Sequence, residues 1–438
     1  MKKLALAGTA LMLASLANGL AEARDDDAIG ALADVIEANY YDEARAREIA
    51  DALRSEAAAG AFGEAPSPDA LASALTNRLH AEDRHFSVRY IGPERAAEII
   101  ARRAAAEAGE APEQPADPWA GLRRENFGFA DIDILPGNIG YIDLRQFAPI
   151  QPAESTARAA LDFIANTDAV IFDLRQNVGG APSMVQYLIS HFLDPEEPVV
   201  INTFVARNLP YPDQLWSLPV HPAGNRPDVP LIVLTSGNTG SAGEAFPYHL
   251  KAMERATIVG ETTHGAGNPG STFFTPEGYA VFISTGSARN PITGTNWEGT
   301  GVTPDIAVPA GDALEAALDR LYDTLLASHE ADSAGRQDVE WARELLAAQR
   351  EPVDIPARQL RRYAGTYGNR HFDTVDGTLV YTREGGSPTE LLPVGNHRFA
   401  IPGNNSYRFV FTPDETGNVG QLEMQIAGSG SRNYPRSR

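Results

Sequence analysis

The chain has 438 residues, a formal net charge of −22 and no cysteine. This length is sufficient for two or three domains, each with its own core. The acidic balance argues against nucleic acid or an anionic membrane as the main partner. The lack of cysteine excludes a thiol nucleophile, disulfides and thiolate metal sites, so any covalent chemistry must use an oxygen or nitrogen nucleophile.

Residues 1–23 have the pattern of a secretory signal peptide: two lysines, an apolar stretch over residues 4–20, and the small-residue sequence Ala21-Glu22-Ala23. We expect cleavage after Ala23, because the apolar stretch is short and interrupted by polar residues and glycines. The sequence therefore predicts an exported protein, periplasmic or extracellular, without stable membrane insertion. It does not indicate the oligomeric state.

The remaining chain divides into regions of different periodicity. Residues 24–110 have helical periodicity and predict an N-terminal helical domain, and residues 111–131 resemble a polar linker. Over residues 132–330, apolar strand-like runs alternate with helical ones, which predicts an α/β domain with a largely parallel core sheet. Residues 331–354 are expected to form a helical connector, and residues 355–438 a small β-rich domain.

Ser241 is placed where a strand becomes a helix. The apolar run 231–234 leads into Gly240-Ser241-Ala242-Gly243-Glu244, and a helical run follows. The first N–H groups of a helix have no partner inside it, so they could stabilise an oxyanion beside the serine hydroxyl. The alternative is that Ser241 only caps the helix, a common use of serine.

A second possible half of an oxyanion hole follows another buried strand. Residues 169–174 lead directly into Arg175-Gln176-Asn177-Val178-Gly179-Gly180. Paired glycines at the carboxyl end of a strand allow backbone N–H groups to approach a ligand closely. We therefore expect Gly179 or Gly180 to donate opposite Ala242. An ordinary tight turn is the alternative.

These two motifs, in this order and about sixty residues apart, resemble those of the tail-specific, or C-terminal processing, serine peptidases. The resemblance implies a crotonase-like (ClpP-like) α/β core and cleavage of polypeptides. No PDZ insertion is evident in the sequence. In this respect the chain resembles the branch that contains the tricorn protease core and interphotoreceptor retinoid-binding protein.

The general base departs from that pattern. In the processing peptidases it is a lysine in a Gly-Lys-Gly turn, and the corresponding position here is Ala266. Lys251 lies nearly three helical turns after Ser241 and is expected at the surface. Similarity to the tricorn-like branch instead implies Ser241 as nucleophile, His85 as base and Glu298 as the group that orients the network. His264 is the alternative base or a residue lining the cleft.

Two further positions qualify this assignment. Arg84 stands where the tricorn protease has a serine, with Ser87 the nearest substitute hydroxyl, and Glu244 is expected to act structurally at the start of the helix. The nine histidines lack metal-binding spacing, so neither a metal nor a cofactor is predicted. A non-catalytic protein that binds an apolar ligand or peptide, and a small-molecule esterase, remain alternatives to an endopeptidase.

Overall fold

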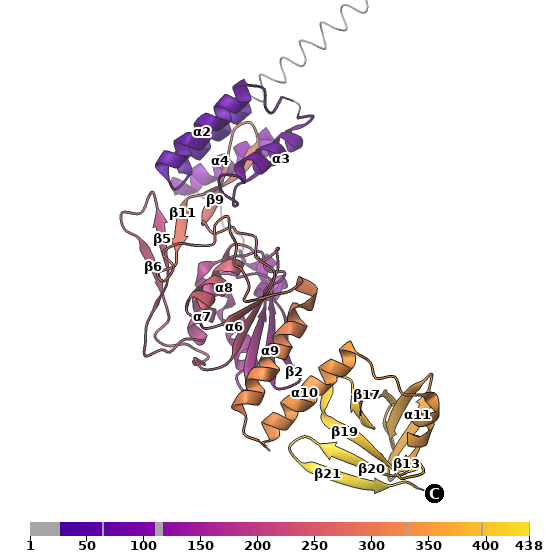
Figure 1. The fold of residues 1–438 in the computed structure, drawn as a ribbon. Coiled ribbons are helices and arrows are strands. Elements are labelled where there is room, and N and C mark those ends of the chain that lie inside the picture. The colour runs from indigo at the N-terminus through magenta and orange to yellow at the C-terminus, as the bar shows by residue number, and fades with distance from the viewer. Residues whose placement is uncertain (1–26, 64, 110–116, 332, 396, 438) are drawn as a thin grey trace, which may run out of the picture.

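The computed structural model describes residues 27–437 except 64, 110–116, 332 and 396. The predicted signal peptide lies outside the described residues. No helix in the described ranges is both long and apolar enough to cross a membrane. From the N-terminus to the C-terminus, a helical lobe, a central α/β region and a β-rich region follow one another (Figure 1).

The central region is a six-stranded sheet in the order β12-β8-β7-β4-β3-β2. Neighbouring strands are parallel except for β2, which runs antiparallel to β3 at one edge. The strands are β2 (Phe129–Leu135), β3 (Ile139–Leu144), β4 (Ala169–Asp173), β7 (Leu231–Thr235), β8 (Thr257–Gly260) and β12 (Ile306–Ala307). The largely parallel sheet and the mixed α/β fold predicted from the sequence are thus confirmed.

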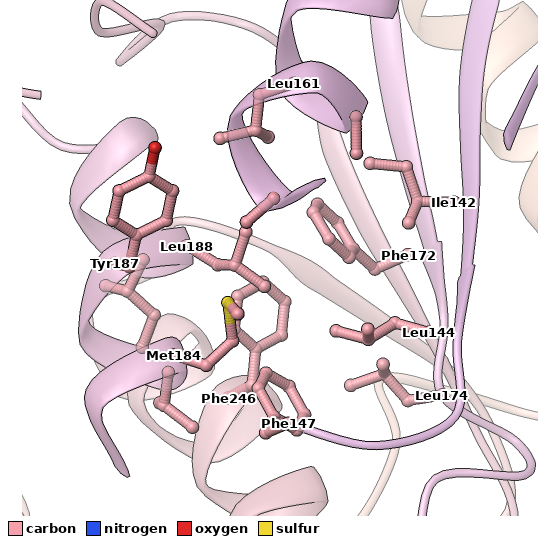
Figure 2. Close-up of a cluster of buried hydrophobic side chains, with 14 of the residues drawn as sticks. Ile142, Leu144, Phe147, Leu161, Phe172, Leu174, Met184, Tyr187, Leu188 and Phe246 are labelled. Atoms are coloured by element: carbon pink, nitrogen blue, oxygen red, sulfur yellow. The ribbon is translucent and has the colours of Figure 1, made fainter. Parts of the chain in front are cut away.

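Helices cover both faces of this sheet, so its central strands are apolar on both sides. On β4, Phe172 faces a cluster formed with α6 (Ile150–Phe163), α7 (Pro182–His191) and α8 (Ala242–Ala252), as Figure 2 shows. The next residue toward the N-terminus, Ile171, packs instead against α9 (Ala313–Ser328). The alternation of side chains along a strand therefore explains why β4 and β7 are continuous apolar runs.

The N-terminal lobe contains helical residues 27–39, α2 (Glu43–Ala58), α3 (Pro68–Leu79) and α4 (Pro93–Glu107). It also contains a sheet in the order β1-β10-β9, formed by β1 (Ser87–Tyr90), β9 (Gly270–Phe274) and β10 (Tyr279–Ser284). Tyr279, Val281 and Ile283 of β10 are buried among the helices of this lobe. The packing therefore differs from the predicted division into residues 24–110 and 132–330, because a hairpin of the second segment completes the core of the first.

Other elements complete the fold. The segment predicted as a linker, 111–131, includes α5 (Ala120–Arg124), a 3₁₀ turn at Asn126–Gly128 and the start of β2. A small sheet in the order β11-β5-β6 consists of β5 (Val200–Ala206), β6 (Asp213–Trp216) and β11 (Gly286–Arg289). A second 3₁₀ turn at Ala310–Asp312 precedes α9.

The C-terminal region follows α10 (Ala334–Arg350), which packs against α9. It has α11 (Ala357–Tyr363) and two antiparallel sheets around an aromatic core. A buried arginine, Arg408, connects it to α10 through Glu344 at 3.1 Å. Its strands are β13 (Gly365–Tyr367), β14 (Arg370–Val375), β15 (Thr378–Arg383), β16 (Thr389–Glu390), β17 (Leu392–Gly395), β18 (Arg398–Ile401), β19 (Asn404–Pro413), β20 (Val419–Ile426) and β21 (Gly430–Pro435).

Candidate active site

Ser241 occupies a backbone conformation that an ordinary helix cap does not use. It follows β7 and directly precedes α8, with φ 54° and ψ −121°. The cap residues Ser67 and Ser333 have the extended backbone usual for this position, with φ of −160° and −74°. A positive φ is costly for a residue with a side chain, and such strain gathers at functional sites. The backbone of Ser241 therefore favours the catalytic interpretation over the capping one.

Glu244 holds this conformation in place. Its carboxylate is fully buried and accepts the N–H of Ser241 at 2.8 Å, the hydroxyl of Thr263 at 2.6 Å, and the N–H groups of Gly265 and Ala266 at 2.6 and 2.9 Å. Burial raises the pKa of Glu244, and these four donors oppose the rise. Glu244 therefore does more than the structural role at the start of the helix that the sequence predicted, because it also connects the serine to the loop at residues 263–266.

Gly179 and Gly180 differ in whether the backbone N–H group already has a hydrogen-bond partner. Gly179 lies against the serine: a Cβ atom built on it would be 2.7 Å from the Cβ of Ser241. Its N–H is already donated to the side chain of Asn177 at 2.9 Å. Within the described part of the chain, the N–H groups of Gly180 and Ala242 have no partner, and both residues line a pocket with Ser241. Gly180 and Ala242 are therefore the better-placed oxyanion donors.

His85 reaches the serine from the N-terminal lobe. It lies two residues before the start of β1, which pairs with β10 so that Ser87 is opposite Phe282, and its ring lies 5.4 Å from the ring of Phe282. His85 lines the pocket next to Ser241. The two side chains form no hydrogen bond in the described structure, an arrangement common for catalytic pairs before substrate binds. Its Nδ1 atom is buried without a hydrogen-bond partner among the described residues.

Two carboxylates lie beside His85. Ligand-type atoms of Asp83, His85 and Glu298 all lie within 4.8 Å of one another. Burial lowers the pKa of His85, with the Asp83 carboxylate opposing the shift. Burial, together with the charge of Asp83, raises the pKa of Glu298 to about 7. The cluster therefore combines an imidazole whose pKa is lowered by burial with two carboxyl groups held by different donors.

Glu298 and Asp83 are anchored by different donors. Glu298 accepts the backbone N–H of Arg84 at 2.8 Å on one oxygen, and those of Gly267 and Asn268 at 2.6 and 3.0 Å on the other. It thus joins the histidine segment to the loop that follows the serine. Asp83 is 2% exposed and accepts the backbone N–H of His85 at 2.8 Å.

Asp83 was not assigned a role from the sequence. Its side chain also accepts the Tyr40 hydroxyl and the Asn268 amide, both at 3.2 Å. The signal was its place two residues before His85, which lets a carboxylate accept the backbone N–H of the histidine segment. A second carboxylate beside the imidazole is therefore the main functional residue that sequence reasoning missed.

The same three residues are the group within the described ranges that could hold a metal ion. Both carboxylates already accept hydrogen bonds from protein donors, and Glu298 accepts three from backbone N–H groups. Each of the two carboxylates accepts three hydrogen bonds from protein donors, so both are held in place beside the imidazole.

The remaining candidates lie at the edge of the site. His264 is exposed on the loop after Thr263, and burial together with the charges of Arg84 and His80 lowers its pKa. Lys251 forms a 2.7 Å ion pair with Asp305, which agrees with its expected place at the surface. Ala266 is 4% exposed, so the position of the family's lysine is packed inside the protein.

Ser241 and His85 lie between two hollows of different character. One is a pocket of about 320 Å³ that contains Gly180 and Ala242 and has no Asp, Glu, Lys or Arg in its lining. His249 in its wall stays neutral, because burial lowers its pKa to about 3. The other is a more open groove of about 750 Å³, lined on its outer part by His264 and Arg84. We call these the acyl pocket and the basic groove.

Comparison with known proteins relates the central α/β region to a family of peptidases. Residues 138–308 match peptidase family S41. A carboxy-terminal-processing protease of Bartonella bacilliformis is 29% identical over 180 residues, which are 40% of this chain and 39% of that protein. A carboxyl-terminal-processing protease of Synechocystis is 28% identical over 214 residues, 46% of this chain and 48% of that protein. The chain thus spans less than half the length of these curated relatives.

Among solved structures, the photosystem II D1 C-terminal processing protease aligns with 65% of this chain and 93% of its own, at 16% identity and a TM-score of 0.40. The tricorn protease aligns with 44% of this chain and 18% of its own, at 18% identity and a TM-score of 0.31. The family match covers the parallel strands, both glycine motifs, Ser241 and Glu298. The α/β region at residues 138–308 of this chain is therefore similar to peptidase family S41.

Proposed function

We propose that this protein is a serine endopeptidase that forms an acyl-enzyme on Ser241 with His85 as the general base. The observation that carries the proposal is the strained backbone of Ser241, at a helix N-terminus, beside two backbone N–H groups that have no hydrogen-bond partner among the residues that the structure describes. Such donors stabilise the charge that develops on a carbonyl oxygen during acyl transfer, a contribution of about 3–4 kcal/mol for a single donor. A serine used only as a cap requires none of these features.

The proposed reaction begins when the Ser241 hydroxyl oxygen attacks the scissile carbonyl carbon and His85 takes the hydroxyl proton. The oxyanion that forms accepts the N–H groups of Gly180 and Ala242. When the tetrahedral intermediate collapses, the carbon–nitrogen bond breaks and His85 gives the proton to the leaving amine. Water then attacks the acyl-enzyme, again with His85 as base, and releases the acid product with the free serine.

The carboxylates support the imidazole in this sequence. His85 becomes positively charged at each proton transfer, and the nearby Asp83 carboxylate stabilises that charge. We assign Glu298 to orientation, because it accepts the backbone N–H of Arg84, next to the histidine, and that of Gly267, on the loop after the serine. In this assignment His85, supported by the carboxylate beside it, replaces the base that a lysine would supply at position 266.

The substrate class follows from the acyl pocket. The oxyanion donors line this pocket, so the acyl half of the substrate must lie over it, with the side chain before the scissile bond pointing inward. Its walls include Val185, Phe204, Leu215, Phe282 and Trp297. An uncharged pocket of this kind suits an apolar side chain of a polypeptide.

Two broader assignments belong to the same proposal. A crotonase-like core is supported by the family match together with the observed parallel sheet. Export to the periplasm or the extracellular space is supported by the leader pattern at residues 1–23. N-terminal sequencing of the protein isolated from an export compartment tests the latter, with a new N-terminus after Ala23 as the expected result.

The function is tested by labelling the folded protein with a fluorophosphonate and mapping the adduct. We expect modification of Ser241 only, and loss of both labelling and hydrolysis of an unfolded polypeptide in Ser241→Ala. Matched acyl ester and peptide substrates separate a peptidase from a small-molecule esterase. A folded protein that binds peptides but neither reacts with the probe nor turns them over would be a binding protein, contrary to the proposal.

A further inference from the structure

The acyl pocket contains two polar side chains that the proposed reaction does not use. They are Asn202 on β5 and His249 on α8, which are 3% and 1% exposed. Trp297 also lines the pocket, but its ring N–H donates to the carbonyl of Ala266 at 2.9 Å. Buried polar atoms normally have hydrogen-bond partners, so the donors and acceptors of Asn202 and His249 must be accounted for one by one.

Asn290 fixes which ring nitrogen of His249 carries the proton. The side-chain oxygen of Asn290 accepts the backbone N–H groups of Ile292 and Thr293 at 2.8 and 3.0 Å, so its amide nitrogen is the atom 2.9 Å from Nδ1 of His249. An amide NH2 group can only donate, so this Nδ1 is unprotonated. Burial lowers the pKa of His249 to about 3, so at neutral pH the ring is uncharged and carries its proton on Nε2. Nε2 has no hydrogen-bond partner among the residues that the structure describes.

Asn202 supplies a second donor close to the first. Its side-chain oxygen accepts the backbone N–H of Thr203 at 2.9 Å, which identifies the other end of the side chain as the NH2 group. In the described part of the chain, nothing accepts from this NH2 group. The antiparallel pairing of Thr203 with Arg289 brings Asn202 beside Asn290, the residue that binds His249. The pocket wall therefore presents two neighbouring N–H donors to whatever occupies the pocket.

These donors limit what the pocket can hold. A purely apolar side chain would pack against the walls but would leave both donors buried without a partner, which is costly because their hydrogen bonds to water are lost and not replaced. A carboxylate would accept from both donors, but it would be a buried charge in a pocket whose lining has no Lys or Arg. An uncharged acceptor at the end of an apolar stem avoids both penalties.

The amide of Asn or Gln is the group that matches both residues. Its oxygen can accept from Nε2 of His249 and from the NH2 group of Asn202. Its own NH2 group can donate to the side-chain oxygen of Asn202, which accepts one hydrogen bond and has the capacity for two. We propose that the acyl pocket prefers substrates with Asn or Gln immediately before the cleaved bond, and that His249 and Asn202 determine this preference. This inference rests on the peptidase function proposed above and refines the apolar side chain assigned to the pocket there.

Pairs of substrates with side chains of equal shape test the preference. The peptides keep the sequence of a site that the enzyme cleaves in an unfolded polypeptide. Only the residue before the cleaved bond varies, as Asn or Leu in one pair and as Gln or homoleucine in the other. We expect the amide member of at least one pair to have the higher kcat/KM, although an amide loses more hydration than a hydrocarbon when it enters the pocket.

Two variants assign the preference to the donors. In His249→Phe the ratio of kcat/KM between the amide and the hydrocarbon substrate should fall by at least about tenfold, equivalent to about 1.4 kcal/mol. Asn202→Leu removes the other donor with little change in shape and should lower the same ratio, which provides a second test should the first variant fold poorly. His191→Phe is the matched control, because His191 is also 1% exposed but is not among the residues that line the pocket. It should keep the wild-type ratio.

Nitrogen-15 NMR of protein labelled at histidine tests the tautomer without any turnover. The histidine signals that disappear in His249→Phe should be those of a ring with Nε2 protonated and Nδ1 unprotonated. A ring protonated on Nδ1 would have no donor for the pocket, and this result would overturn the proposal.

The outcomes distinguish the preference from the function. If the peptides are cleaved and the hydrocarbon member is preferred in both pairs, the preference is refuted and the peptidase function stands. The same holds if the amide-to-hydrocarbon ratio is unchanged in both His249→Phe and Asn202→Leu. If the wild-type protein cleaves no unfolded polypeptide, the proposed function fails and this inference falls with it.

Discussion

At position 241 we expect a glycine variant to be more stable than an alanine variant, whereas inside a helix the alanine variant is the more stable of the two. At φ 54° and ψ −121°, an L-amino acid pays about 1–3 kcal/mol in backbone strain, whereas glycine adopts this region without a Cβ clash. Glycine also loses about 0.5–1 kcal/mol more conformational entropy on folding than alanine. Ser241→Gly should therefore be about 1 kcal/mol more stable than Ser241→Ala, although both variants lose the hydroxyl.

The measurement is urea unfolding of the two variants side by side, followed by the fluorescence of Trp297, which is buried beside the acyl pocket. Ser73 provides the control, because it is exposed inside helix α3. There the glycine variant should be less stable than the alanine variant by about 1 kcal/mol. If Ser241→Gly is no more stable than Ser241→Ala, the strain argument for a catalytic serine is wrong.

Three further predictions concern the groups around the serine. His85→Ala should lower kcat/KM by about three to four orders of magnitude and His264→Ala by less than about tenfold, measured with one peptide substrate, and the reverse ranking would exchange their roles. Gly180→Ala should destabilise the protein by about 2–4 kcal/mol in urea unfolding, since its Cβ would lie 2.1 Å from a backbone oxygen, whereas Gly311→Ala, in open space, should not. Burial raises the pKa of Glu298 to about 7 from 4.5, so the folded state keeps a proton that the unfolded state releases between these values. Stability from this group then falls as pH rises through that window, and Glu298→Gln should reduce the fall in unfolding experiments across it; an identical pH slope in both proteins would contradict the shifted pKa.

The sequence was sufficient to predict the sheet that carries the nucleophile. The runs 169–172 and 231–234 are apolar at every position because helices cover both faces of β4 and β7, and such runs are the clearest strand signal available. The glycine motifs after these strands could be located for the same reason. Contacts within one sheet follow from local pattern and from the rule that the carboxyl ends of parallel strands share an edge.

The lobe that supplies His85 could not be predicted to the same extent. Its position depends on the pairing of β1 with β10, whose paired residues are nearly 200 positions apart. Strands β9 and β10 were absent from the sequence interpretation, and no local pattern encodes that side chains of β10 are buried by helices of the other lobe. The hydrogen bonds of Glu244 were likewise unpredictable, since three of its four donors come from a loop about twenty residues away.

The division of the site between two lobes has a consequence for catalysis. Ser241 follows β7 of the central sheet and is held to the loop at residues 263–266 through Glu244, whereas His85 is fixed to the helical lobe through β1 and Asp83. Glu298 is the carboxylate that spans the two, because one of its oxygens accepts the N–H of Arg84 and the other accepts the N–H groups of Gly267 and Asn268. A lysine at position 266 would lie on the loop that donates hydrogen bonds to Glu244. It would therefore be held near Ser241 without a connection between the two lobes. Because the proposed base, His85, comes from another lobe than the proposed nucleophile, Ser241, the distance between them depends on how the lobes pack. In this proposal the hydrogen bonds of Glu298 to both lobes keep that distance short enough for proton transfer.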